Sequence, residues 1–277
     1  MNKASQKQEY LNQILDILVD PLDSRSLKLK DDELQGKKTT YEIVNNIPIM
    51  IPPINLRESI YTEQVNDLWK ELQNLEYTMY LDNPVGVFSH DNHKTAIQTG
   101  NIINALCEGN CLDIGCGALP FPSYMKAAPK ISFYGTDPYF GNVERDFPFA
   151  QSLAECLPFK DESFDNALIA TSLDHMYFPE IALTHINRVL KDSGNLFVWQ
   201  TCYPNHYAPY QLWASSKAQN PAQAVQFDAY HQWAFTRESL SELLEKTGFN
   251  IAGLTLYQRY GNGGEEILIH ATKKKEI

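Results

Sequence analysis

The fold is decided by a stretch of seven residues, Cys111-Leu112-Asp113-Ile114-Gly115-Cys116-Gly117. Its first four residues are mainly apolar, which predicts a buried strand over residues 111–114 that leads directly into a glycine turn. Because glycine has no Cβ, the backbone at Gly115 and Gly117 can approach a ligand closely. Asp113 is predicted to order the turn or to accept a hydrogen bond from a ligand's ammonium. Several nucleotide-binding folds contain a G-x-G turn, so the surrounding sequence has to distinguish them.

Around this turn the chain alternates between strand and helix patterns. We predict helices over residues 94–106, 123–127, 180–190 and 237–247, and strands over residues 111–114, 131–135, 167–171, 195–200, 251–257 and 266–271. The last two strands are predicted to form a closing hairpin. Such alternation is typical of an α/β fold with a doubly wound, mostly parallel sheet, whose ligands bind at the carboxyl ends of the strands.

An acidic residue also follows the second of these strands. The strand 131–135 ends in Thr136-Asp137-Pro138, and an acid at this place can accept both hydroxyls of a ribose. The alternative for Asp137 is the N-cap of a helix. A nicotinamide dehydrogenase would also place an acid here, but its fingerprint is G-x-G-x-x-G, and Pro120 occupies the position of the third glycine.

Residues 113–117, 153–169 and 187–196 together resemble the class I S-adenosylmethionine (SAM)-dependent methyltransferases, the family that includes ubiquinone and menaquinone biosynthesis enzymes. The resemblance implies a seven-stranded Rossmann-like sheet, SAM as cofactor and S-adenosylhomocysteine as product. It also implies which residues contact each part of the cofactor. The residues that line the methionyl part are Asp113, Gly115, Cys116 and Gly117. Asp137 binds the ribose, Ala154 and Glu155 lie by the adenine, and Thr171 flanks the cofactor at the end of the fourth strand.

Two places depart from the pattern of that family. The third glycine of its turn is replaced by Leu119, and Pro120 and Pro122 follow, which predicts an altered start of the next helix. Leu153 occupies the position where relatives often have an acid that binds the adenine amino group. We therefore expect that contact to come from the backbone or from Glu155.

The methyl acceptor is expected to bind where the fourth and fifth strands end. His175 has the pKa range of a general base, and the alternative is a role in packing or in ordering the loop. Residues 201–233 are too long for an ordinary connection and predict an aromatic lid. The candidate substrate-binding residues are Tyr177, His206, Tyr207, Tyr210, Tyr230, His231 and Trp233.

Residues 1–55 predict a small α+β domain ahead of the main one. A helix ending at residues 18–19 and strands over 26–30 and 40–44 precede a proline-rich boundary. This part resembles the zinc-ribbon-like domain found in activators of tRNA methyltransferases. Asp20 and Asp23 occupy the positions of two of its zinc-binding cysteines, so we expect no zinc. The alternative is a plain β-hairpin lid.

The next two segments complete the predicted organisation. Residues 56–93 are interpreted as a helical linker and cofactor-covering segment, with a helix over 58–80. His90 and His93 have the spacing of a metal-binding pair, but no third ligand accompanies them, and a loop that covers the cofactor is the preferred interpretation. Residues 94–277 are predicted to form the methyltransferase domain, with the lid as an insertion.

The composition limits the partners of the protein. The chain has 277 residues, of which 43% are hydrophobic, and this composition predicts a globular protein. Its formal net charge of −11 predicts that it does not bind nucleic acid. Its five cysteines form no C-x-x-C pair, and neither a signal peptide nor a membrane span is recognised. We therefore expect a cytoplasmic protein without metal and without a membrane partner.

The function predicted from these observations is methyl transfer from SAM to an O, N or C atom of a small molecule. A secondary metabolite, a sugar or a quinone-like ring would be such an acceptor. One alternative is an RNA base methyltransferase, which the N-terminal resemblance suggests and the charge opposes. The other is a non-catalytic SAM-binding partner or activator subunit, which an intact cofactor site opposes.

Overall fold

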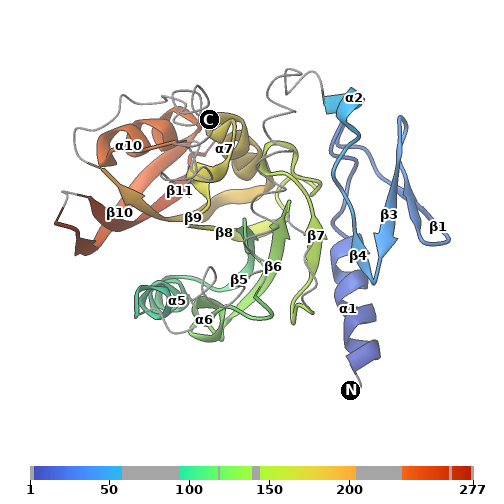
Figure 1. Cartoon of the computed structure of the whole chain (residues 1–277), viewed down its shortest axis with the longest axis horizontal. Coiled ribbons are helices and arrows are strands. Elements are labelled where there is room, and N and C mark those ends of the chain that lie inside the picture. Colours follow the sequence, from blue (N-terminus) through green and yellow to red (C-terminus); the bar gives the residue numbers. More distant parts are fainter. Residues whose placement is uncertain are drawn as a thin grey trace, which may run out of the picture.

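The computed structural model describes residues 3–57, 94–117, 119–138, 144–203, 233–261 and 264–275. Its largest element is a seven-stranded sheet in the order β10-β11-β9-β8-β5-β6-β7 (Figure 1). The strands are β5 (Gly109–Ile114), β6 (Ile131–Asp137), β7 (Phe149–Gln151), β8 (Phe164–Ala170), β9 (Leu190–Cys202), β10 (Phe249–Arg259) and β11 (Glu265–Lys273). Strand β11 runs antiparallel to both of its neighbours, and the pairs from β9 to β7 are parallel. The predicted Rossmann-like fold class is confirmed.

The order of the strands places a ligand crevice at one position of the sheet. The chain proceeds from β5 outward through β6 to β7, and then returns to the other side of β5 to continue through β8 and β9. In open α/β sheets ligands bind at this switch point, outside the carboxyl ends of the strands. We call this side of the sheet the ligand edge. The loops after β5 and β8 therefore meet there.

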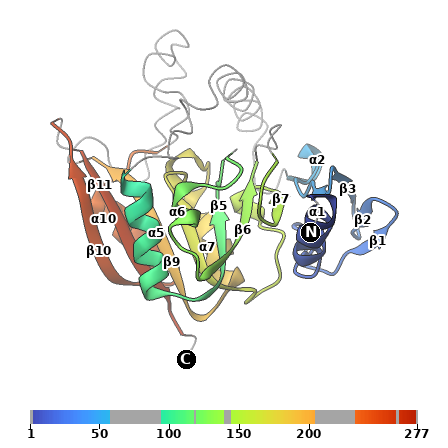
Figure 2. The same cartoon turned by 90° about the horizontal axis from the view of Figure 1, so that it is seen from below.

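Helices cover both faces of the sheet, as Figure 2 shows. Helices α5 (Lys94–Leu106) and α6 (Ser123–Lys126) lie on one face, and α7 (Pro179–Val189) and α10 (Arg237–Lys246) lie on the other. The helix predicted over residues 94–106 is confirmed residue for residue. In the part of the chain that the structure describes, no helix is long and apolar enough to cross a membrane.

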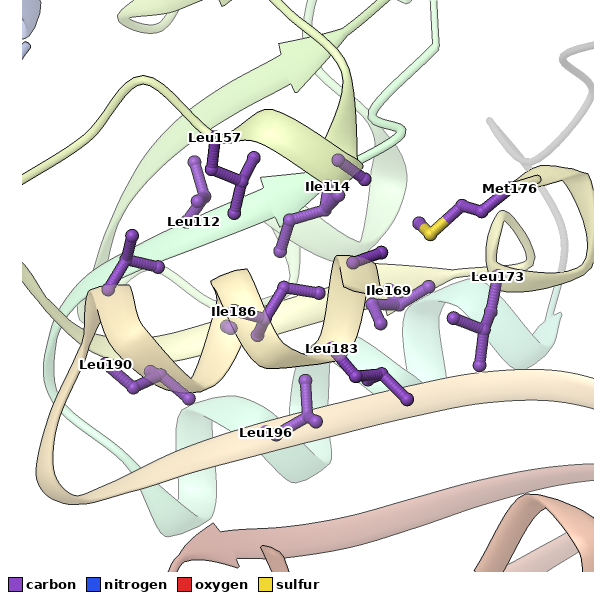
Figure 3. Close-up of a cluster of buried hydrophobic side chains, with 14 of the residues drawn as sticks. Leu112, Ile114, Leu157, Ile169, Leu173, Met176, Leu183, Ile186, Leu190 and Leu196 are labelled. Carbon is purple, nitrogen blue, oxygen red and sulfur yellow. The ribbon is translucent and has the colours of Figure 1, made fainter. Parts of the chain in front are cut away.

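The core under α7 shows why these segments fold as they do. Leu183 and Ile186 of α7 belong to the same buried cluster as Leu112 of β5, and all three are fully buried (Figure 3). Alternate residues of β5 face opposite sides, so Cys111 belongs to the core under α5 and Leu112 to the core under α7. Burying one such leucine or isoleucine contributes about 1.5–3 kcal/mol.

A second, antiparallel sheet of four strands precedes the large one, in the order β1-β2-β3-β4. Its elements are α1 (Lys3–Leu15), β1 (Lys28–Lys30), β2 (Glu33–Gln35), β3 (Thr40–Val44), β4 (Ile47–Pro48) and α2 (Ile54–Arg57). We call residues 3–57 the N-terminal unit. The prediction that the first helix ends at residues 18–19 was wrong, because residues 17–19 form backbone hydrogen bonds and an isolated bridge with residues 158–160 instead of continuing the helix.

The N-terminal unit packs directly on the β7 edge of the large sheet (Figure 1). Val19 N donates to Pro158 O at 2.8 Å, Lys160 N donates to Ile17 O at 2.9 Å, and Met50 N donates to Gln151 O at 2.8 Å. Apolar residues of the unit share one buried cluster with the large sheet. The domain boundary at residue 55 stays a prediction, and the helix predicted over residues 58–80 lies outside the described residues.

Candidate functional site

The turn after β5, residues 115–117, adopts a conformation that only glycine takes readily. Gly115 and Gly117 have φ angles of +76° and +67°. A Cβ on Gly115 would lie 2.5 Å from both Cβ and Oγ of Ser172, the second residue after β8. Ser172 Oγ in turn donates to Ile114 O at 2.6 Å. The glycine turn and the loop after β8 are thus in close contact at the ligand edge.

Asp113 lies beneath the turn with no exposed surface. Tyr124 of α6 donates its hydroxyl to Asp113 Oδ2 at 2.7 Å, and Asp113 Oδ1 has no hydrogen-bond partner among the described residues. Burial raises the pKa of Asp113 to about 7, while the bond from Tyr124 lowers it and the nearby Asp137 raises it. A buried carboxyl with an unused oxygen is suited to receive a cationic group of a ligand.

Asp137 and Arg145 hold the backbone of Gly117 from its two sides. Gly117 N donates to Asp137 Oδ2 at 2.8 Å, and Arg145 Nη2 donates to Gly117 O at 2.8 Å. The guanidinium of Arg145 lies 3.8 Å from the ring centre of Phe149, and the residue is 6% exposed. Sequence reasoning missed Arg145, because no motif links it to a turn 28 residues earlier.

Ala154 and Glu155 lie in a short 3-10 helix, η2 (Ala154–Cys156), and both are buried. The Glu155 carboxylate accepts from Tyr177 N at 2.9 Å and from Phe178 N at 3.3 Å, just before α7 begins. An acid at this place satisfies free N–H groups of a helix start. Glu155 therefore joins the predicted adenine segment to α7, and its contact with adenine stays a prediction.

Thr171 follows β8 with a φ angle of +56°. This left-handed conformation is unusual for a β-branched residue and marks strain of the kind found at functional sites. Thr171 N donates to Trp199 O at 2.8 Å, which fixes the loop against β9. Thr171 directly precedes Ser172, which touches the glycine turn, and its contact with the cofactor stays a prediction.

The predicted acceptor residues are only partly described. His175 ends a second 3-10 helix, η3 (Leu173–His175), with its Nε2 3.8 Å from Asp174 Oδ1 and its side chain 33% exposed. Tyr177 is buried, and Trp233 donates its Nε1 to Met176 O at 2.8 Å. His90 and His93 lie outside the described residues, as do most of the predicted lid and five substrate candidates in it, namely His206, Tyr207, Tyr210, Tyr230 and His231.

Sequence reasoning also missed a buried carboxylate at the ligand edge, that of Glu266. Glu266, near the start of β11, is 4% exposed and accepts from Trp199 Nε1 at 2.8 Å and from Tyr260 OH at 3.1 Å. Arg237 and Arg259 bind its neighbour Glu265. Within the described part of the chain, no three His, Cys, Asp or Glu side chains come together as a metal site.

Comparisons with known proteins assign this arrangement to a family. Residues 88–253 match the family described as "Methyltransferase domain". An O-methyltransferase, resE, of Aspergillus sclerotiorum is 32% identical over 126 residues, which are 45% of this chain and 42% of that protein. The ubiquinone/menaquinone biosynthesis C-methyltransferase UbiE of Teredinibacter turnerae is 38% identical over 68 residues, 24% of this chain and 26% of that protein. The chain thus spans less than half the length of either relative.

Among solved structures, a 1,6-didemethyltoxoflavin-N1-methyltransferase of Burkholderia thailandensis, with bound 1,6-didemethyltoxoflavin and S-adenosylhomocysteine, has a similar fold. Its TM-score is 0.54 at 15% identity, and the match covers 87% of this chain and 97% of that one. At this identity the likeness shows the fold alone. The family match covers more than half of the chain and agrees with the glycine turn and the sheet order, so this protein belongs to the class I SAM-dependent methyltransferases.

Proposed function

We propose that this methyltransferase transfers the methyl group of SAM to an O, N or C atom of a small-molecule acceptor. Candidates for the acceptor are a secondary metabolite, a sugar or a quinone-like ring. Five free, buried cysteines suit a reducing compartment, and we place the protein in the cytoplasm. The observation that carries the proposal is the fully buried Asp113 beneath the glycine turn, with one oxygen unused.

The residues at the ligand edge fit SAM. We assign the ammonium of its methionyl part to Asp113 and the rest of that part to residues 115–117, where a Cβ on Gly115 would collide with Ser172. The ribose is assigned to Asp137, the last residue of β6, at the place of the family's ribose-binding acid. The adenine is assigned to Ala154 and Glu155, and Thr171 flanks the cofactor.

SAM supplies an electrophilic methyl group on a sulfonium. The protein then has to hold the acceptor atom about 3–3.5 Å from that methyl group, in line with the breaking bond, and to exclude water. His175 is the candidate base where the acceptor atom carries a proton. Its partly exposed ring beside the buried Asp174 suits a group that exchanges protons with solvent.

The acceptor atom is left open by the relatives. Their names describe methylation of an oxygen, a carbon and a nitrogen. Each of the two that name a compound names a small molecule, and the net charge of −11 opposes binding to a phosphate backbone. These observations favour a small molecule over RNA, which is the first alternative acceptor.

Binding of the cofactor is tested by calorimetry with S-adenosylhomocysteine. We expect Asp137→Ala to weaken binding roughly tenfold or more, since a hydrogen bond to a charged group contributes about 1.5–3 kcal/mol. Asp146→Ala is the matched control, because Asp146 is a nearby exposed acid. Unchanged affinity in Asp137→Ala would contradict the assignment of the ribose.

The acceptor class is tested with methyl-labelled SAM. The purified protein is incubated separately with a small-molecule extract and with bulk RNA, and the label is followed by chromatography and mass spectrometry. We expect label in the small-molecule fraction. Label in RNA alone would establish the RNA alternative, and binding of SAM without label in either fraction would favour the non-catalytic partner.

A further inference from the structure

Tyr124 connects the helix α6 to the cofactor site. It is 3% exposed, and its hydroxyl is 2.7 Å from Asp113 Oδ2. Helix α6 has only four residues, and its position depends on close packing against α5. At Gly100 of α5, a Cβ would lie 2.2 Å from Tyr124 O, so only a glycine allows the two helices to approach in this way. Tyr124 is thus fixed on Asp113.

The bond from Tyr124 leaves Asp113 with one oxygen for a ligand. Asp113 Oδ1 is fully buried and lacks a partner among the described residues. Unpartnered buried oxygens are uncommon, because each one loses its bonds to water. An ammonium group satisfies such an oxygen best, since it supplies both a hydrogen bond and an opposite charge.

We propose that Tyr124 is a positioning residue, which orients Asp113 so that Oδ1 receives the ammonium of the methionyl part of SAM, and that binding of this ammonium displaces a proton from Asp113. This inference rests on the proposed function. The proton balance is simple: the Asp113 carboxylic acid loses its proton to the buffer and becomes the carboxylate that pairs with the ammonium. No other bond forms or breaks.

The charges around Asp113 support the coupling of ligand binding to the release of a proton from Asp113. Burial raises the pKa of Asp113 to about 7, so this carboxyl is partly protonated at neutral pH when no ligand is bound. The other titratable groups that interact with it are Asp137 in β6, Cys111 in β5, Cys116 in the turn and Tyr124 itself. Asp137 repels its negative charge. Burial holds the pKa values of both thiols and of Tyr124 well above their usual ranges, so these three groups remain neutral.

The direct test is to count the protons released when S-adenosylhomocysteine binds, by calorimetry in pairs of buffers with different ionisation enthalpies. Since the pKa of Asp113 is about 7, the wild type is expected to release close to one proton at pH 6 and almost none at pH 8.5. Binding of 5′-methylthioadenosine, which has no ammonium, is expected to release none. The comparison of the two ligands needs no variant.

Tyr124→Phe tests the positioning role. The Tyr124 hydrogen bond lowers the pKa of Asp113, so its loss is expected to move the pH midpoint of proton release upward by about one unit. At pH 7 the dissociation constant for S-adenosylhomocysteine then rises about fivefold. Tyr134→Phe is the matched control, because Tyr134 lies in β6 and packs on Phe164. We expect it to leave the midpoint unchanged.

The possible results of these experiments distinguish the role of Tyr124, the release of a proton and the proposed function. Proton release that is equal for both ligands, or absent at pH 6, overturns this inference alone if S-adenosylhomocysteine still binds. A Tyr124→Phe variant that weakens binding equally at all pH values shows that Tyr124 has only a structural role. Failure of the wild type to bind S-adenosylhomocysteine at any pH would remove the proposed function as well.

Discussion

At the scale of single residues, the cofactor site combines conformational and electrostatic demands on a few side chains. Asp113 is a carboxyl without exposed surface, and Arg145 is a guanidinium almost as deeply buried. Burying charged groups costs free energy unless their partners compensate. Arg145 is compensated by Gly117 O and by the ring of Phe149. Asp113 keeps one buried oxygen, Oδ1, that has no hydrogen-bond partner among the described residues.

Arg145→Met is predicted to weaken binding of S-adenosylhomocysteine roughly tenfold, because Gly117 O loses its charged donor. Calorimetry at pH 8 measures the effect. Arg25→Met is the control, since Arg25 is an exposed arginine of the N-terminal unit. Equal affinity in Arg145→Met and the wild type would show that the turn keeps its binding geometry without the bond from Arg145.

The titration of Asp113 predicts how the stability of the ligand-free protein depends on pH. The pKa of Asp113 is raised from 3.8 to about 7 on folding, so its contribution to stability is complete below pH 4 and is lost as the pH rises through 7. Asp113→Asn is expected to remove this loss. Relative to the wild type, it should gain up to a few kcal/mol in the free energy of unfolding between pH 4 and pH 8. Urea unfolding at both pH values measures the gain, and a constant difference would contradict the raised pKa.

At the scale of elements, the ligand edge depends on contact between loops from different strands. The turn after β5 touches Ser172 after β8, and the Glu155 carboxylate in η2 bonds to the backbone before α7. Each contact links a predicted cofactor segment with the part of the chain expected to hold the acceptor. A change in one loop is therefore expected to affect the other.

Gly115→Ala is predicted to abolish measurable cofactor binding, because a Cβ there is opposed both by the φ angle of +76° and by Ser172 at 2.5 Å. The matched control is Gly253→Ala in β10, where a Cβ would meet nothing within 4 Å. Circular dichroism and calorimetry on both variants separate folding from binding. Normal binding by Gly115→Ala would show that the turn rearranges freely.

Glu155→Gln is predicted to lower the free energy of unfolding by about 1 kcal/mol, because the charge that satisfies the N–H groups of Tyr177 and Phe178 is lost at the start of α7. Glu242→Gln on α10 provides the control, as Glu242 is exposed. Equal unfolding midpoints for the two variants in guanidinium would argue against this role of Glu155.

At the scale of the whole molecule, the N-terminal unit and the large sheet share a hydrophobic core. Leu18 and Met50 from the unit belong to the same buried cluster as Leu157 and Phe159. Backbone hydrogen bonds flank η2 on both sides, at Gln151 and at Pro158. The unit therefore supports the segment that we assign to the adenine.

Leu18→Ala is predicted to destabilise the entire chain by about 2–5 kcal/mol in a single cooperative transition, because the cavity forms in the shared core. Leu29→Ala in the same unit is the control, since Leu29 is 57% exposed. Fluorescence and circular dichroism during denaturation provide the two readings. Separate transitions would mean that the N-terminal unit unfolds independently.

Several features could be predicted from the sequence because they depend on neighbours along the chain. Hydrophobic periodicity located α5, α7 and α10, and the pairing of a buried strand with glycines located the turn at 115–117. Strand β7 escaped prediction because three residues are too short to show a period. The N-terminal helix was extended too far because apolar residues 17–19 continue its pattern while their backbone bonds elsewhere.

By itself the sequence predicted the fold class and the family, both of which are confirmed. It also predicted a cofactor site at the ligand edge, since an alternating sheet with a glycine turn has one such edge. Only the tertiary structure decided which side chains serve that edge. Tyr124 reaches Asp113 from a neighbouring helix, and Trp199 meets Glu266 across 67 residues of chain. Such partners are brought together by the path of the chain through the sheet, and no local pattern of residues records that path.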